Sequence, residues 1–295
     1  MFAILELRIS QSTVFFLPLD IPLIRRRPKI RLAVEEREYM RAAGQFNAEL
    51  MDHVRPHVKP GVTTGEIDRI VHDYTLDHHH IPACLGYPGD RGPFPKSCCI
   101  SVNEVVCHGI PGSYVLKPGD IVNVDLTTIV DGWHGDQSET FLIGPRDQIS
   151  AEAVAITQCA FDCLYLAIDV ISPGCRISVI GEAIVEYVSQ NYGFGVVDKY
   201  VGHGIGTKFH QPPNIPHVAT RQSYQERLHP GMCFTIEPMI NGGTAKTLND
   251  RYDGWTVRTL DGKLTAQFEH TILMTESGPE ILTGTKSGPQ KGFRF

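Results

Sequence analysis

The chain has 295 residues, of which 42% are hydrophobic and 20% are charged, and its formal net charge is −6. These values describe a soluble globular protein with an ample core, in one large domain or two. The mild negative charge argues against a nucleic-acid-binding surface over the whole molecule, and we expect no DNA partner. Eight cysteines without any Cys-x-x-Cys pair indicate reduced thiols in a cytoplasmic protein.

Residues 1–34 are predicted to be an N-terminal extension that forms an extended arm. The apolar run at 14–24 contains two prolines and an aspartate, and it is far shorter than the roughly 20 residues that a membrane helix needs. The basic cluster at 25–29 follows this run, which is the reverse of the order in a secretory signal. We therefore expect no membrane segment. The arm either has no catalytic role or contacts ribosomal RNA through its arginines.

The folded part is predicted to begin with two helices. Apolar residues recur at helical spacing from 35 to about 58, and Pro60-Gly61 ends this helix. Thr63 and Glu66 fit a capping box that begins the second helix. Three histidines at 78–80 lie at its end. Because adjacent side chains on a helix point apart, we expect these histidines to be solvated and not to bind one ion.

A loop and a short strand are predicted next. The segment 81–97 is rich in glycine and proline, so we predict a loop, and this loop contains Cys84 and Tyr87. A strand is predicted at 99–102. His108 follows a short apolar run and stands before a glycine, where a histidine is usually structural, but it leads directly into an acidic hairpin.

This hairpin, at 121–138, is the most informative stretch of the chain. Polar and apolar residues alternate along its first strand, as in a half-buried strand, and Asp131-Gly132 suits a two-residue turn. That turn would pair Thr127 with Asp136 and place Asp125 and Asp136 diagonally on one face, with Cα atoms roughly 7–8 Å apart. Two carboxylates this close inside a sheet repel or share a proton unless a cation lies between them. The alternative is an exposed hairpin with two solvated acids.

The chain also resembles itself. The sequence pattern of residues 116–126 recurs at residues 228–238. The pattern around Pro60-Gly61 recurs around Pro173-Gly174, at nearly the same offset along the chain. The first repeat brings Asp125 into register with Glu237. Such self-similarity indicates an internal duplication, in which each half contains helices joined by a Pro-Gly turn and then strands. A pseudo-twofold axis would bring the strand carboxylates of both halves to the middle.

Two further polar residues complete a candidate metal site. His203 lies in a Gly-x-Gly-x-Gly stretch without the strand-to-helix context of a dinucleotide loop, so its glycines are interpreted as allowing close backbone packing around a ligand. Alternation at 267–272 predicts a strand with Glu269 on its polar face. The resulting set is oxygen-rich: Asp125, Asp136, His203, Glu237 and Glu269. It suits two divalent ions of the Mn(II), Fe(II) or Co(II) type, and two metals with a bridging water imply hydrolysis.

Six motifs, in order, resemble the type I methionine aminopeptidases: Val-Cys-His-Gly-Ile-Pro (106–111), Asn-Val-Asp (123–125), His-Gly-Asp (134–136), Gly-His-Gly-Ile-Gly (202–206), Phe-Thr-Ile-Glu-Pro (234–238) and Gln-Phe-Glu-His-Thr (267–271). The resemblance runs from about 35 to 282. It implies an α/β pita-bread fold, a pseudo-twofold antiparallel sheet backed by helices, with a dinuclear metal site at its centre. The catalytic domain would cover 35–284, in halves of about 35–148 and 149–284, followed by a tail at 285–295.

The resemblance also implies a role for each metal ligand. Asp125 would bind one metal ion through both oxygens. Asp136 and Glu269 would bridge the two ions. His203 and Glu237 would complete the second site, and a bridging hydroxide would attack with Glu237 as the proton shuttle.

The substrate contacts follow in the same way. His108 would contact the amide of the scissile bond, and His210 would contact the carbonyl or its oxyanion. The methionine side chain would lie in a pocket lined by apolar and sulfur-containing residues, which suits a thioether: Cys84, Tyr87, Cys99, Phe209 and Trp255. The segment from Tyr87 to Pro95 is longer than the family pattern, so the place of Phe94 at the pocket rim stays open.

The implied activity is removal of the N-terminal methionine from nascent proteins whose second residue is small, by a monomer. One alternative is an Xaa-Pro aminopeptidase or prolidase, which shares the fold and the metal set, but the His-Gly-Ile-Pro context favours methionine. Another is a creatinase-like enzyme that needs no metal, which the five intact ligands argue against. A third is a non-enzymatic binding module with the same fold.

Overall fold

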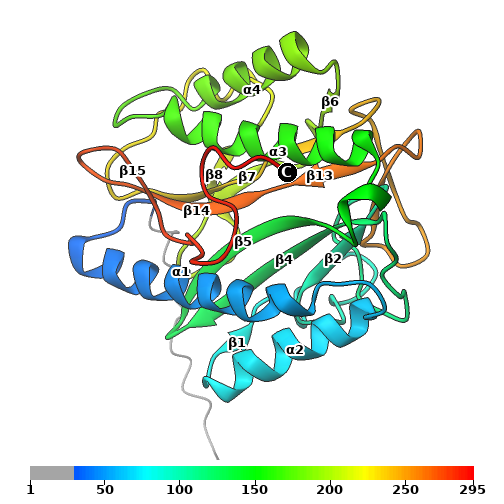
Figure 1. Cartoon of the computed structure of the whole chain (residues 1–295). Coiled ribbons are helices and arrows are strands. Elements are labelled where there is room, and N and C mark those ends of the chain that lie inside the picture. Colours follow the sequence, from blue (N-terminus) through cyan, green and yellow to red (C-terminus); the bar gives the residue numbers. More distant parts are fainter. Residues whose placement is uncertain (1–29) are drawn as a thin grey trace, which may run out of the picture.

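The structure is a computed structural model that describes residues 30–295, so most of the predicted arm, with its arginines and the ribosomal contact, lies outside the described residues. Two pairs of helices lie on either side of a curved sheet (Figure 1). One pair is α1 (Val34–Val54) and α2 (Thr64–Asp77), and the other is α3 (Ala151–Asp169) and α4 (Ser178–Asn191). Two short 3-10 helices are η1 (Arg55–His57) and η2 (Arg146–Gln148).

The main sheet has nine strands in the order β1-β4-β5-β14-β9-β7-β8, with β2 paired to β4 and β15 paired to β14. Their bounds are β1 (Ile81–Pro82), β2 (Cys99–Val102), β4 (Ile121–Val130), β5 (Trp133–Leu142), β7 (Gly202–Gly204), β8 (Gln211–Ile215), β9 (Cys233–Ile236), β14 (Glu269–Met274) and β15 (Pro279–Ile281). All the named pairs are antiparallel. This is the predicted curled antiparallel sheet backed by helices.

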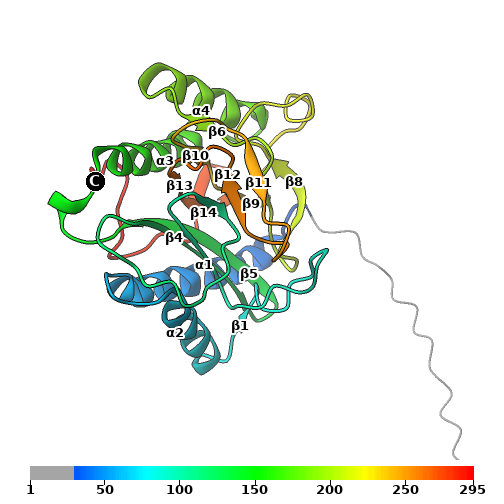
Figure 2. The same ribbon diagram turned by 90° about the vertical axis from the view of Figure 1, so that its right-hand side faces the viewer.

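Two three-stranded sheets, β13-β10-β6 and β11-β12-β3, complete the fold (Figure 2). Their strands are β3 (Val105–Cys107), β6 (Gly195–Val196), β10 (Met239–Asn241), β11 (Thr247–Asn249), β12 (Val257–Thr259) and β13 (Thr265–Gln267). The predicted loop at 81–97 needs one correction, because β1 lies within it and pairs with β4. A two-residue strand at the edge of a sheet tolerates Pro82, which cannot donate to a ladder.

The predicted hairpin and its register are confirmed. Asp131 and Gly132 have φ values of 48° and 85°, the positive values that the tight turn requires. Val130 pairs with Trp133, and Thr127 pairs with Asp136. Because side chains alternate along a strand, this register puts the two hairpin aspartates on the same face.

The two helical pairs follow the duplication seen in the sequence. Gly61 and its repeat Gly174 have φ values of 88° and 86°, and Gly119 and its repeat Gly231 have 94° and 85°. Equivalent glycines thus take the same left-handed conformation in both halves, at turns that other residues would enter only with strain. The capping box before α2 is also formed, with the N–H of Glu66 donating to Thr63 Oγ1 at 3.1 Å.

The first helix is shorter than predicted. α1 ends at Val54 and the chain continues as η1, which contains Pro56 near its start. Proline has no N–H with which to continue the helical ladder, so the last turn tightens and the α-helix ends before residue 58.

The predicted continuous strand at 267–272 is wrong in one respect. β13 ends at Gln267 and β14 begins at Glu269, and the two strands belong to different sheets. Between them, Phe268 is 3% exposed and packs against the α3 core. Burying this ring turns the chain out of the small sheet and into the main one, so the break lies beside a candidate metal ligand.

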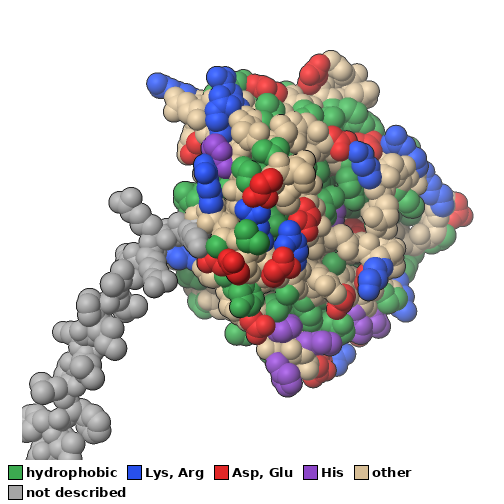
Figure 3. Space-filling view, turned by 90° about the vertical axis from the view of Figure 1, so that its left-hand side faces the viewer, with side chains coloured by type: hydrophobic (Ala, Val, Ile, Leu, Met, Phe, Trp, Pro, Cys, Tyr) green, Lys and Arg blue, Asp and Glu red, His purple; other side chains and the backbone are tan. Residues whose placement is uncertain are grey.

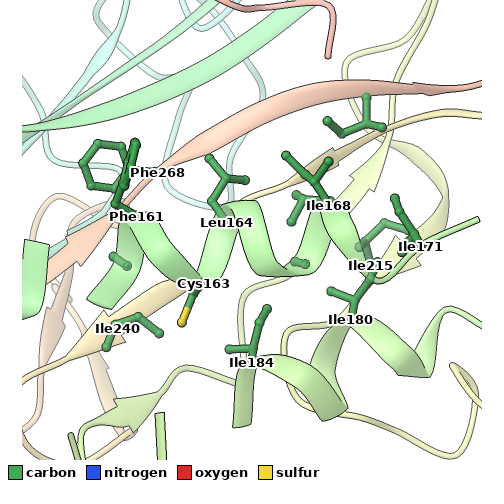
Figure 4. Close-up of a cluster of buried hydrophobic side chains, with 14 of the residues drawn as sticks. Phe161, Cys163, Leu164, Ile168, Ile171, Ile180, Ile184, Ile215, Ile240 and Phe268 are labelled. Carbon is green, nitrogen blue, oxygen red and sulfur yellow. The ribbon is translucent and has the colours of Figure 1, made fainter. Parts of the chain in front are cut away.

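The larger hydrophobic core lies between α3, α4 and the sheets (Figure 4). Phe161 and Leu164 of α3 lie near Phe268, and Ile184 of α4 faces α3. α3 is long and apolar enough to cross a membrane by composition alone, but 67% of that stretch is buried in the protein, as in a core helix. All eight cysteines are free.

The three consecutive histidines lie at the end of α2, and histidine side chains gather along the lower edge of the face shown in Figure 3. His78 and His79 are exposed, as predicted. His80 is partly buried, with its ring edge-on to Phe46 at 4.4 Å between centroids.

The tail at 285–295 is attached to the body. The Asp52 carboxylate accepts hydrogen bonds from the backbone N–H groups of Lys286 and Ser287, and the ring of Phe295 lies edge-on to Phe161. The division into extension, catalytic domain and tail stays a prediction.

Candidate metal centre and active site

One cavity of about 600 Å³ is lined by every site residue that the sequence singled out. Its acidic part contains the predicted metal ligands: Asp125, Asp136, His203, Glu237 and Glu269. Its apolar part contains the residues of the predicted methionine pocket: Cys84, Tyr87, Cys99, Phe209 and Trp255. His108 and His210 line the same cavity. The fold thus combines residues spread over most of the chain in one site.

The acidic part lies where the two halves of the main sheet meet. Glu269 of β14 pairs with Ser138 of β5, two residues after Asp136. Asp136, His203 and Glu269 each offer one ligand atom within 4.8 Å of the others. His203 Nε2 lies 3.5 Å from Asp136 Oδ2 and 3.7 Å from Glu237 Oε1. These are separations that one bound ion can span.

The electrostatic properties of the candidate metal ligands favour a bound cation. Burial, together with the charge of Asp136, raises the pKa values of Asp125 and Glu269 well above the ordinary carboxyl range. Burial also raises the pKa of Glu237 to about 7. Burial lowers the pKa of His203, but its hydrogen bond to Asp136 and the charge of Glu237 outweigh that effect and raise it overall. Divalent ions would neutralise this oxygen-rich set, so the residues fit a metal centre.

Threonine hydroxyls orient two of the carboxylates. Thr127 donates to Asp136 Oδ1 at 2.8 Å, and Thr235 donates to Glu237 Oε1 at 2.8 Å. The Thr235 oxygen also accepts the backbone N–H of His203 at 3.0 Å. These residues were missed by sequence reasoning. The alternation that places Thr127 on the face of Asp125 could have revealed it, whereas the contact of Thr235 with His203 depends on the pairing of β7 with β9.

His108 has an unusual backbone at the edge of the cavity. Its φ is 55°, and a Cβ atom on the following Gly109 would come 2.2 Å from the Ile100 carbonyl oxygen. Strained conformations of this kind cluster at functional sites. Its ring lies edge-on to Tyr200 and Trp255. Burial lowers the pKa of His108 to about 4, so the ring is neutral near pH 7 and able to exchange hydrogen bonds.

His210 is held by a partner that the sequence did not suggest. Its Nδ1 lies 2.8 Å from the Tyr87 hydroxyl. Burial lowers the pKa of His210 to about 3 and raises that of Tyr87, so both groups are uncharged near neutral pH. A tyrosine hydroxyl that donates to Nδ1 leaves the proton on Nε2, where it can be donated to a substrate oxygen.

The apolar part of the cavity is built from thiols and aromatic rings. Cys84 and Cys99 are 5% and 6% exposed. The longer segment from Tyr87 to Pro95 folds over Trp255, since a Cβ on Gly89 would come 2.2 Å from that indole. Phe94 is thereby brought into the lining, edge-on to Trp255 at 5.3 Å. The extra residues therefore leave Phe94 in the cavity wall.

A family model for metallopeptidase family M24 matches residues 38–276. The match covers most of the chain, and the chain belongs to this family of metal-dependent hydrolases.

The similar proteins are methionine aminopeptidases. One from Escherichia coli K12 is 49% identical over 251 residues, which cover 84% of this chain and 91% of the relative. The methionine aminopeptidase A of Synechocystis is 51% identical over 254 residues, covering 85% and 96%. The crystal structure of the Rickettsia prowazekii methionine aminopeptidase superposes with a TM-score of 0.81 at 43% identity, covering 86% of this chain and 99% of that one.

Proline-specific enzymes share the fold at a greater distance. The prolidase from Pyrococcus furiosus matches with a TM-score of 0.67 at 19% identity, and the chain covers 66% of that protein. This likeness shows the pita-bread architecture alone.

Proposed function

We propose that this M24 hydrolase is a methionyl aminopeptidase that removes the N-terminal methionine of nascent proteins with a small second residue, using two divalent ions. The observation that carries the proposal is the cavity, in which five candidate metal ligands adjoin a thiol- and aromatic-lined pocket. Two methionine aminopeptidases, which are 49% and 51% identical to this chain over 251 and 254 aligned residues, support the same activity.

The metal ligands in this proposal are Asp125, Asp136, His203, Glu237 and Glu269. Bound divalent ions lower the pKa of a coordinated water and so supply a nucleophile at neutral pH. Mn(II), Fe(II) and Co(II) all suit a set of four carboxylates and one imidazole.

Three side chains of the protein transfer the proton and bind the substrate. Glu237, whose carboxylate is oriented by Thr235 and Gln267, takes the proton from the attacking water and passes it to the leaving amine. His210, with its Nδ1 against Tyr87, donates from Nε2 to the substrate carbonyl oxygen as negative charge develops there. His108 contacts the amide of the scissile bond.

The pocket selects methionine by shape and by the chemistry of sulfur. Cys84 and Cys99 offer polarizable thiols. The contact of Cys99 with Cys84 and its burial raise the pKa of the Cys99 thiol well above the ordinary range, so this thiol stays uncharged. Phe209 and Tyr87 meet edge to face at 5.1 Å between ring centroids and close another side. A flexible thioether packs well in such surroundings.

The experiment compares three tripeptides with purified, metal-stripped, full-length protein. We expect Mn(II), Fe(II) or Co(II), added without oxygen, to restore cleavage of Met-Ala-Ser but not of Met-Leu-Ser or Ala-Pro-Ser. Cleavage of Ala-Pro-Ser would move the protein to the proline-specific members. No cleavage with any of the three ions would instead favour a binding module.

We also propose that the protein is a monomer and is located in the cytoplasm. Sedimentation of the same sample tests the monomer, and fractionation of cells tests the location.

A further inference from the structure

The backbone at Glu237 is unlike that of its counterpart in the first half. Asp125 lies in the middle of β4, where it pairs with Cys99 on one side and Ser138 on the other. Glu237 lies just after the end of β9, before the chain enters β10 of another sheet. The next residue is Pro238, which has no N–H. The N–H of Glu237 is therefore the one backbone donor between β9 and β10, and it needs an acceptor outside the strand.

His217 supplies that acceptor. Its side chain is fully buried, at 0% exposure, and its Nε2 accepts the N–H of Glu237 at 3.1 Å. Because Nε2 accepts, a neutral ring carries its proton on Nδ1. Within residues 30–295, Nδ1 is a buried atom without a hydrogen-bond partner. The ring thus makes a single hydrogen bond, and that bond is to the backbone of a candidate metal ligand.

The sheet is built so that this contact can form. His217 comes two residues after β8, and β8 is separated from β9 by the three-residue strand β7. Gly202 of β7 is essential to the close approach, because a Cβ there would come 2.4 Å from the Thr235 carbonyl oxygen and 3.1 Å from Ile215 Cβ. The narrow middle strand brings the end of β8 toward the end of β9.

An imidazole is a suitable acceptor at this position. A carboxylate would add another negative charge beside buried acids, whereas a ring nitrogen accepts a hydrogen bond without one. The Glu237 side chain is held separately, by Thr235 at Oε1 and by Gln267 at Oε2, the latter at 3.2 Å. Side-chain and backbone bonds together determine the direction in which the carboxylate points.

We propose that His217 is a positioning residue for Glu237, which it holds by accepting the backbone N–H at the break between β9 and β10. The proposal rests on the proposed function, in which Glu237 is a metal ligand and carries the proton. Groups that orient a metal ligand typically change metal affinity or activity by about 10–100-fold when they are removed.

The test uses full-length protein with His217→Ala and His217→Leu, which remove the acceptor, and His217→Gln, which keeps one. Ile184→Ala is the matched control, because Ile184 is also fully buried in the second half but lies in α4, away from the cavity. The measurements are Co(II) affinity by titration calorimetry, the Co(II) absorption spectrum, kcat and KM for Met-Ala-Ser, and stability by urea unfolding.

We expect His217→Ala and His217→Leu to bind Co(II) about 10–100-fold more weakly, with an altered spectrum, a lower kcat and little change in KM. His217→Gln should recover most of the affinity. Ile184→Ala should lose stability but keep the affinity and the spectrum. Co(II) binding by His217→Leu that equals the Ile184→Ala control would overturn the proposal, whether or not His217→Ala folds. Failure of the proposed function appears differently, as a wild-type protein that binds Co(II) but does not cleave Met-Ala-Ser.

Discussion

The two halves of the molecule carry their candidate metal ligands in different ways. Asp125 and Asp136 lie in the interiors of β4 and β5, two ten-residue strands that pair along their whole length. Glu237 and Glu269 lie where the chain passes between sheets, after β9 and at the start of β14. The pseudo-twofold fold therefore places acids at corresponding positions but surrounds them with different backbones.

This difference shows what each half needs to make a precise site. Both aspartates lie within paired strands: Asp125 pairs with Cys99 on one side and Ser138 on the other, while the backbone N–H of Asp136 donates to the Thr271 hydroxyl at 3.2 Å. Glu269 still pairs with Ser138, but Glu237 lies beyond the end of β9, where side-chain bonds from Thr235, Gln267 and His217 hold it. The second half should therefore be more sensitive to loss of its supporting residues.

The largest effect is expected at a ligand of the first half. Asp136→Asn should abolish nearly all cleavage of Met-Ala-Ser, because an amide is a poor substitute for a carboxylate that would hold the proposed divalent ions, and losing their stabilisation of charge costs several kcal/mol. That loss corresponds to about 10³-fold or more in kcat. Asp131→Asn is the control, since it changes an exposed acid at the tip of the same hairpin, where asparagine tolerates the positive φ. Near-normal turnover by Asp136→Asn would refute the assigned role.

The comparison of halves is tested most directly by two isosteric threonine variants. Thr127→Val and Thr235→Val each remove one hydroxyl that donates at 2.8 Å to a candidate ligand. We expect Thr235→Val to weaken Mn(II) binding by about 10–100-fold, and Thr127→Val by clearly less, because Asp136 stays within β5, which pairs with β4 along its whole length. Titration calorimetry with Mn(II) provides the measurement. Equal losses in the two variants would show that the strand backbone gives no extra support.

A smaller and graded effect is expected from pH. In the metal-free protein the pKa of Glu237 is raised by burial to about 7, so its stabilising contribution is present below the ordinary glutamate pKa and is lost as pH rises through 7. Divalent ions need the ionised carboxylate, so metal binding should have the opposite trend and weaken as pH falls below 7, by up to tenfold per pH unit for each proton released. Calorimetry in two buffers of different ionisation heat should detect more released protons at pH 6 than at pH 8. The same count at both pH values in wild type would contradict this.

The smallest effect is expected where the halves contact each other across the cavity. Tyr87 belongs to the first half and His210 to the second, and the Tyr87 hydroxyl lies 2.8 Å from His210 Nδ1. Tyr87→Phe keeps the aromatic ring but removes a hydrogen bond worth about 1 kcal/mol, or about fivefold in rate. We expect kcat to fall by that factor while KM for Met-Ala-Ser stays the same. A rise in KM alone would indicate that Tyr87 only shapes the methionine pocket.

Much of the fold follows from local patterns in the chain. The Asp131-Gly132 turn sets the register of a hairpin whose strands alternate, so the shared face of Asp125 and Asp136 follows from the residue pattern alone. The Pro-Gly repeats indicate the duplication, because their left-handed conformation is a local requirement. These features depend on near neighbours, and short-range sterics and hydrogen bonding decide them.

The tertiary structure alone decided how the candidate site is supported. The sequence pattern predicted one strand at 267–272, but burial of Phe268 against α3 divides it between two sheets. His217, Thr235 and the contact of Tyr87 with His210 become visible only when β7, β8 and β9 pack together and the 87–95 segment folds over Trp255. Such contacts join residues far apart in the chain, and they arise from the shared burial of several elements, so no local pattern encodes them.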